Sequence, residues 1–377
     1  MPPCTRLDAR DAMLAIAWQD GTSAEFASVW LRDNLPEDRD TYSGQRLIDV
    51  TDLPPEPRIR RATLLDTTLS VEWQDEARIT TFALDWLYRH ALACRVSPEL
   101  EPQRWLEGGR LEPGRDLACQ PIAVMQTDAR IRLQWLTRLW QRGIAFLRQA
   151  PATEAALIQA MALVGRVAET NYGRVFDVRA VPQPENLAYS DLGLGLHTDN
   201  PYRNPVPGFQ ALHTLIAAPD GGESLFADGF ALAEELRTAC PEAFAVLTRT
   251  AVPFRYRSEQ AELYAERPLI ELTCTGVVSA VHYNSRSIAP LRLAAADCGP
   301  FYAAYRRLGE MLREPRFQLR TLLASGDIVV FDNQRILHGR TGFASARHAR
   351  HLRGCYLTRD SVYSETALLR RRIGDGA

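Results

Sequence analysis

The stretch LGLHTDNPYRNPVPG, residues 194–208, carries the residue pair on which the fold and the chemistry of this chain depend. His197 and Asp199 are two residues apart, so on an extended segment their side chains point to the same face. A second stretch, FDNQRILHGR at 331–340, adds His338 on a run that is typical of a β-strand. Two neutral imidazoles and one carboxylate form the facial triad of non-haem Fe(II) oxygenases. His197, Asp199 and His338 are therefore the candidate iron ligands and catalytic residues.

The pair alone is weak evidence, because His197 can equally be a hydrogen-bonded loop histidine and Asp199 a cap. Arg350 lies 12 residues beyond His338, and its planar guanidinium can bind the C5 carboxylate of 2-oxoglutarate in bidentate fashion. The alternative is a surface arginine in the Arg-rich run 346–354. Together the four residues predict an Fe(II)- and 2-oxoglutarate-dependent dioxygenase that uses O2 to hydroxylate its substrate.

An internal repeat organises the first hundred residues. The segment LAIAWQDGTSAEFASVWL (14–31) is similar to LSVEWQDEARITTFALDWL (69–87), and each copy predicts two strands followed by the start of a helix. We expect a small α+β domain at 1–97, a linker rich in Pro, Gly and charge at 98–118, and an oxygenase domain at 119–377.

Short β-type runs dominate the expected oxygenase domain. Apolar residues at helical spacing first predict helices at 125–148 and 154–167. The β-type runs follow at 208–216, 223–226, 252–256, 277–283 and 327–331, with a helix at 301–312. Many short strands bounded by Gly and Pro favour a double-stranded β-helix, or jelly roll. The predicted fold is thus mainly β with helices, a jelly-roll catalytic domain behind the small α+β domain.

Composition excludes several classes of function. The chain has no lysine, so all 44 basic residues are arginines, and neither a Schiff-base lysine nor a P-loop lysine exists. A net charge of -2 leaves no positive excess for phosphates, so nucleic acid is not an expected partner. Without a signal-like N-terminus or a long apolar window, the protein is expected to be cytoplasmic and free of membranes.

Several strings in this sequence resemble the γ-butyrobetaine hydroxylase branch of the 2-oxoglutarate oxygenases. They are WLRDN (30–34), NLAY (186–189), LHTDNPY (196–202), GGES and DGF within 221–230, FDNQRILHGR (331–340) and RHLRGCY (350–356). The resemblance implies a jelly roll behind an N-terminal domain and a homodimer. It places the iron triad on the three residues named above, the 2-oxoglutarate salt bridge on Arg350, and a backbone contact with this cosubstrate near Leu212.

An aromatic cage for a trimethylammonium group is also implied by the resemblance. It falls on Tyr172, Phe176, Tyr189 and Tyr356, and Asn186 belongs to the same substrate site. A quaternary ammonium cannot donate a hydrogen bond, so aromatic faces are its best desolvated partners. The alternative for each aromatic residue is a place in the hydrophobic core.

The chain departs from its relatives at a structural zinc site. Carnitine-forming relatives follow WLRDN with a cysteine-rich segment and place a histidine in the second repeat. Here Leu35 and Glu37 stand at the first two cysteine positions, and Ala77 stands at the histidine position. We therefore expect no zinc.

The second departure concerns the acidic end of the substrate. His282 occupies a position where relatives use an asparagine, and Asn284 and Arg286 are close to it. These side chains offer more hydrogen-bond donors and more positive charge than a carboxylate requires, and a phosphonate would use them. The favoured substrate is therefore 2-(trimethylammonio)ethylphosphonate, oxidised at the carbon two from nitrogen. γ-Butyrobetaine, hydroxylated to carnitine, is the alternative. A cupin-like metal-binding protein or hydrolase is a more remote one.

Overall fold

The computed structural model describes residues 2–74, 76–91, 100–179, 193–218, 220–343 and 350–374. The chain divides into two compact units, Met1–Pro98 and Glu99–Ala377, and each is treated by itself. Within the ranges given, no helix is both long enough and apolar enough to cross a membrane.

The N-terminal unit is built from the sequence repeat. Each copy forms the two strands and the helix that the pattern predicts, and an additional strand before each copy completes an antiparallel three-stranded sheet. The first copy contains β1 Cys4–Arg10, β2 Met13–Trp18, β3 Ser23–Ala27 and α1 Ser28–Asp33; the second contains β4 Ile59–Leu65, β5 Thr68–Trp73, β6 Ile79–Ala83 and α2 Leu84–Ala91. Trp18 and Trp73 are equivalent in the two copies, and both lie in the shared hydrophobic core.

Ion pairs join α1 and the segment after it to the second repeat. The Arg32 guanidinium lies 2.7 Å from a carboxylate oxygen of Glu76 and 2.6 Å from one of Asp38. Arg78 also contacts Asp38, at 2.9 Å. Leu35, at the first of the cysteine positions of the relatives, is fully buried in the apolar core.

Two facing β-sheets form the centre of the second unit, the jelly roll that the sequence predicts. The larger sheet has the order β10-β21-β12-β19-β8-β7, with β9 also paired to β21, and the smaller has the order β11-β20-β13-β18. Larger-sheet strands are β7 Cys119–Pro121, β8 Ile144–Arg148, β9 Val167–Ala168, β10 Phe176–Arg179, β12 Phe209–Ile216, β19 Ile328–Asp332 and β21 His351–Leu357. Those of the smaller sheet are β11 Leu194–His197, β13 Ser224–Asp228, β18 Leu319–Thr321 and β20 Ile336–Arg340.

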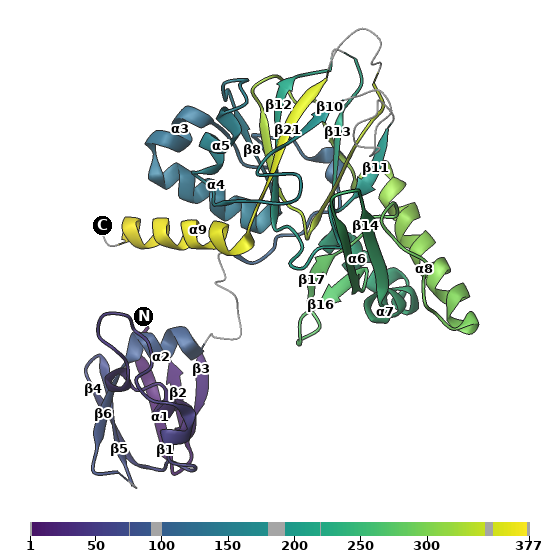
Figure 1. The fold of residues 1–377 in the computed structure, drawn as a ribbon. Helices are drawn as coiled ribbons and strands as arrows, with labels where there is room; N and C mark the ends of the chain where they lie inside the picture. The colour runs from purple at the N-terminus through teal and green to yellow at the C-terminus, as the bar shows by residue number, and fades with distance from the viewer. Residues whose placement is uncertain are drawn as a thin grey trace. The chain divides into compact units, whose positions relative to one another are not determined.

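Helices cover the outer faces of both sheets (Figure 1). On the larger sheet lie α3 Ile122–Thr127, α4 Ala129–Arg142, α5 Ala156–Met161 and α9 Arg359–Gly374. On the smaller sheet lie α6 Gly229–Ala239, α7 Pro241–Arg249 and α8 Ala295–Arg313, together with the strand pairs β14 Val252–Arg257 with β15 Glu262–Arg267 and β16 Ile270–Leu272 with β17 Val278–Val281. Between the sheets, side chains such as Phe146, Phe226 and Phe331 make a third apolar layer.

Three sequence predictions differ from the structure in this unit. The helix predicted at 125–148 ends at Gly143, whose φ of 75° is left-handed, and 144–148 is the strand β8. Both faces of β8 are buried, so its continuous apolar run has no period of two to reveal it. The predicted helix at 154–167 is shorter, because it ends at Met161. In the predicted linker, Trp105 is buried between the sheets of the second unit, so this part is packed rather than free.

Candidate active site

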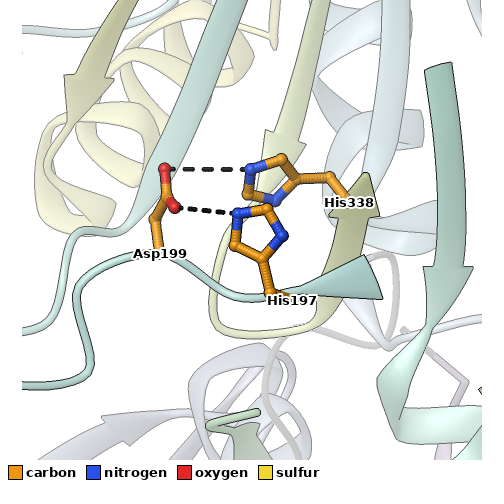
Figure 2. Close-up of side chains that lie close together, drawn as sticks. All are labelled: His197, Asp199 and His338. Carbon is orange, nitrogen blue, oxygen red and sulfur yellow. Dashed lines mark ion pairs between the residues drawn. The ribbon is translucent and has the colours of Figure 1, made fainter. Parts of the chain in front are cut away.

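Strand pairing brings the two histidines of the predicted triad together. On β11 and β20 of the smaller sheet, His197 is directly opposite His338. Asp199 follows just beyond the end of β11, and its carboxylate faces both imidazoles (Figure 2). The His197 Nε2 lies 3.3 Å from Asp199 Oδ1, and the His338 Nε2 lies 3.8 Å from Asp199 Oδ2. The three ligand atoms lie within 4.8 Å of one another, close enough to share one metal ion.

Hydrogen bonds fix the backbone that carries Asp199. Its N–H donates to Asn333 Oδ1 at 2.7 Å, and Asn333 Nδ2 donates back to the Asp199 carbonyl at 3.0 Å. The preceding Thr198 donates from its N–H to the Tyr283 carbonyl at 2.8 Å. Asn284 Nδ2 donates to the Thr198 carbonyl at 2.9 Å. These bonds hold the carboxylate in place before any ligand binds.

The protonation states suit a metal site. His197 Nδ1 lies 2.9 Å from the Gly195 carbonyl, which can only accept, so Nδ1 carries a hydrogen and Nε2 is the ring nitrogen that faces Asp199. Burial, assisted by the His197 ring, lowers the pKa of His338 to about 3. Burial alone would raise the pKa of Asp199, but the two imidazoles and the Tyr356 hydroxyl outweigh it and hold that pKa below the usual range. At neutral pH the cluster therefore contains a neutral His338 imidazole and an ionised Asp199 carboxylate.

The cluster lies in a cavity between the two sheets. Its lining is Tyr172, Phe176, Val178, Leu194, His197, Asp199, Asn200, Gln210, Leu212, Ser224, Phe226, Arg286, His338, Gly339, Arg340, Arg350, Leu352 and Tyr356. Sequence reasoning missed Gln210 and Arg340. Each is two residues from a named residue on the same strand, Leu212 and His338 respectively, so the period of two on a strand could have found both.

Three of the predicted cage residues form one aromatic wall of this cavity. Phe176 lies 5.1 Å from the Tyr356 ring and 6.4 Å from the Tyr172 ring, measured between centroids. Phe176 on β10 is paired with Gly354 on β21, and its ring covers that glycine, where a Cβ would meet two ring carbons at 2.5 Å. The Tyr356 hydroxyl donates to Asp199 Oδ2 at 2.8 Å. Burial and the adjacent carboxylate raise the Tyr356 pKa well above 10, so the phenol stays protonated.

Arginines supply positive charge to the cavity. The guanidinium groups of Arg340 and Arg350 both lie over the Phe343 ring, 5.3 and 5.7 Å from its centroid. Burial and the neighbouring Arg340 lower the pKa of Arg350 to about 10, which still leaves it charged at neutral pH. Arg286 reaches the lining from the segment after β17 and is partly exposed. Among the described residues of the lining, Asp199 is the only carboxylate, so the site favours an anionic ligand.

The structure does not bring two predicted substrate-binding residues into the lining. His282 is buried, with Nε2 3.0 Å from Glu271 Oε1, and Asn284 uses its amide to hold the Thr198 backbone. Both side chains are thus engaged elsewhere. Asn186 and Tyr189 lie outside the residues that the structure describes.

Comparisons with known proteins agree with this geometry. Residues 120–356 match the family described as "Taurine catabolism dioxygenase TauD, TfdA family", and residues 5–88 match "Gamma-butyrobetaine hydroxylase-like, N-terminal". The chain is 35% identical to a γ-butyrobetaine dioxygenase of Pseudomonas sp. (strain AK-1), over 95% of this chain and 94% of the relative. It is 26% identical to a trimethyllysine dioxygenase of Meyerozyma guilliermondii, over 94% and 93%, and 27% identical to a human γ-butyrobetaine dioxygenase, over 97% and 96%.

These matches decide between the classes of protein that the sequence left open. The first family model covers more than half of the chain, and the relatives are matched over nearly their whole length. A cupin-like binding protein or hydrolase does not fit them. The chain belongs to the TauD, TfdA family of dioxygenases and is an enzyme that depends on Fe(II), 2-oxoglutarate and O2.

Proposed function

We propose that this dioxygenase hydroxylates a trimethylammonium carboxylate of the γ-butyrobetaine type, at the carbon two from nitrogen. The observation that carries the proposal is the aromatic wall of Tyr172, Phe176 and Tyr356 in the same cavity as the His-Asp-His cluster. Relatives named γ-butyrobetaine dioxygenase and trimethyllysine dioxygenase support it, since both substrates carry a trimethylammonium group.

In this proposal His197, Asp199 and His338 hold the iron. Two imidazoles and one carboxylate are the donor set that suits non-haem Fe(II), and they leave three of six octahedral positions free. Bound Fe(II) supplies the activation of O2 that couples loss of CO2 from 2-oxoglutarate to hydroxylation. One oxygen atom enters succinate and the other enters the new hydroxyl group. The neutral His338 imidazole and the hydrogen bonds between Asn333 and the Asp199 backbone prepare the site for the metal.

Arg350 receives the C5 carboxylate of 2-oxoglutarate, as the sequence predicts. Its buried guanidinium lines the cavity, and it contacts the ring of Phe343, as the guanidinium of Arg340 also does. A desolvated, planar guanidinium makes strong paired hydrogen bonds with a carboxylate. Leu212, which lines the same cavity, would supply the backbone contact with this cosubstrate that the resemblance implies.

The aromatic wall binds the trimethylammonium group. Each ring contributes about 0.5–2 kcal/mol to binding of a desolvated cation, so three rings together make charge recognition measurable. The tert-butyl compound 5,5-dimethylhexanoate has the shape of γ-butyrobetaine without its charge. We expect it to bind at least tenfold more weakly, which corresponds to about 1.4 kcal/mol. Equal binding of the two compounds would contradict recognition of the positive charge by these three rings.

Arg286 is the candidate partner for the acidic end of the substrate. It is the remaining guanidinium of the described lining, and it is not one of the two that contact Phe343. With the nitrogen held by the wall, the carbon second from nitrogen is C3 of γ-butyrobetaine. The relatives favour this carboxylate over the phosphonate that the sequence first suggested.

The phosphonate stays a second candidate because Arg286 is present in the cavity and a phosphonate carries more charge than a carboxylate. In 2-(trimethylammonio)ethylphosphonate the second carbon from nitrogen is bonded to phosphorus. Compared with γ-butyrobetaine, this compound lacks one methylene but has a larger acidic group, so the two molecules are similar in overall length.

A panel assay separates the candidates. Succinate formation is measured with γ-butyrobetaine, trimethyllysine and the phosphonate at saturating 2-oxoglutarate, with and without Fe(II). We expect the highest kcat/KM for γ-butyrobetaine and a loss of it in Arg286→Ala, with the KM for 2-oxoglutarate unchanged. A higher kcat/KM for the phosphonate would select the second candidate. Turnover without iron, or none with any member of the panel, would contradict the proposed function.

A further inference from the structure

One side chain joins the aromatic wall to the proposed metal site. Tyr356 lies on β21 between two paired strands, with Gln210 of β12 on one side and Ala168 of β9 on the other. Its side chain is 4% exposed, so both the ring and the hydroxyl have little freedom to move. The ring lines the cavity beside Phe176, and the hydroxyl donates to Asp199 Oδ2 at 2.8 Å.

The hydrogen bond distinguishes the two oxygens of the carboxylate. Oδ2 accepts from the phenol, whereas Oδ1 lies 3.3 Å from His197 Nε2. Neighbouring ligand atoms around an octahedral ion with bonds of roughly 2.1 Å lie about 3 Å apart, which is close to this separation. Oδ1 takes no part in the bond to Tyr356 and is therefore the oxygen left to bind a metal beside His197, whereas Oδ2 is the oxygen nearer to His338, at 3.8 Å.

We propose that the Tyr356 hydroxyl keeps Asp199 a single-oxygen ligand, and so preserves the three open positions that 2-oxoglutarate and O2 require. A carboxylate that bound through both oxygens would occupy a fourth position. Tyr356 acts through Asp199 and is in this respect a positioning residue, distinct from its part in the cage. The inference rests on the proposed iron site.

The same geometry links substrate position to the metal. The Tyr356 ring belongs to the wall proposed to bind the trimethylammonium group, and its hydroxyl donates to the proposed metal ligand Asp199, so one side chain connects the two sites. Loss of the hydroxyl leaves the ring but frees the carboxylate. We expect the variant to decarboxylate 2-oxoglutarate without a matching amount of hydroxylation.

The test compares Tyr356→Phe with Tyr172→Phe. Tyr172 provides a matched control, since its phenol lines the same cavity but contacts the Tyr202 hydroxyl, at 3.3 Å, and not Asp199. Metal-free protein is titrated anaerobically with Fe(II), and the charge-transfer absorption of its complex with Fe(II) and 2-oxoglutarate is recorded. Removing a partner of a metal ligand typically weakens metal binding by about 10- to 100-fold. We expect this loss, and a changed absorption band, in Tyr356→Phe alone.

The possible outcomes are distinguishable. If the wild-type protein binds no Fe(II), the proposed iron site fails. If it binds Fe(II) and Tyr356→Phe has the same affinity, absorption band and ratio of succinate to product, only this inference is overturned. Replacement of Tyr356 by 3-fluorotyrosine, which retains the hydroxyl, should keep wild-type metal affinity. A loss of affinity in that variant would also contradict the role of the hydrogen bond.

Discussion

Gly354→Ala tests the aromatic wall through the backbone that supports it. Gly354 of β21 is opposite Phe176 of β10, and the phenylalanine ring lies directly on it. An added Cβ would stand 2.5 Å from the ring atoms Cε2 and Cζ, and 3.1 Å from Leu212 Cδ2. Because carbon atoms in contact lie about 3.5–4.0 Å apart, the ring must retreat by about 1 Å.

The size of the effect follows from this displacement. Overpacking of this kind costs typically about 1–3 kcal/mol of stability, so the protein should still fold. A misplacement of about 1 Å at a binding group can cost as much as 100-fold in rate. We therefore expect kcat/KM for γ-butyrobetaine to fall by about 10- to 100-fold, while the KM for 2-oxoglutarate changes much less.

A double-mutant cycle with Phe176→Leu makes the assay specific. In the Phe176→Leu background the ring is absent, so Gly354→Ala should lower kcat/KM only slightly further. The difference between its effects in the two backgrounds should correspond to about 0.5–3 kcal/mol, the range found for side chains in contact. Gly299→Ala in α8 is the control, since nothing lies within 4 Å of its added Cβ. The reasoning is refuted if Gly354→Ala leaves kcat/KM unchanged, or if its cost is equal in both backgrounds.

Three further predictions concern other buried groups. Arg350→Gln should raise the KM for 2-oxoglutarate at least tenfold, which corresponds to about 1.4 kcal/mol. Arg353→Gln should leave this KM unchanged, since Arg353 contacts Glu154. Equal KM values for the two variants would contradict a salt bridge between Arg350 and 2-oxoglutarate. His213 is buried and its pKa is lowered by burial to about 4, so the unfolded chain takes up the proton more readily and stability is lost as pH falls from 6.5 toward 4. His213→Leu lacks the titrating group, so in urea unfolding at pH 5 it should avoid about 2 kcal/mol of the acid-induced loss of unfolding free energy. If the unfolding free energy of His213→Leu depends on pH as that of the wild-type protein does, His213 is not the cause of the loss. Arg335→Met leaves the buried Asp228 carboxylate unpaired and should lower the unfolding free energy by about 3–5 kcal/mol, whereas a loss below about 1 kcal/mol would show that the pair is not needed.

The sequence predicted those parts of the site that follow from local geometry. His197 and Asp199 share a face because side chains alternate on an extended segment, and the structure brings His338 to the same place on the neighbouring strand. The repeat in the N-terminal unit likewise specifies the same strands and helix twice. Local alternation is thus a sufficient guide where one face of a strand is buried and the other is not.

Tertiary contacts decided what the sequence could not. The first four residues of Ile144–Arg148 are all apolar, and only the layers on both sides make the segment a strand instead of the end of a helix. His282 lies near Arg286 in sequence, yet its side chain is buried against Glu271 while Arg286 reaches the cavity. No local pattern reveals that Phe176 lies on Gly354, or that Tyr356 contacts Asp199. The homodimer implied by the resemblance stays a prediction.

The most direct test of the account is a product analysis with γ-butyrobetaine, Fe(II), 2-oxoglutarate and O2. Succinate is quantified against the hydroxylated product, and the position of the hydroxyl is determined by NMR. We predict one succinate for each product molecule and a hydroxyl on C3, the carbon second from the nitrogen held by the aromatic wall. Hydroxylation at another carbon, or succinate formation that γ-butyrobetaine and the other trimethylammonium acids fail to stimulate, would contradict the account.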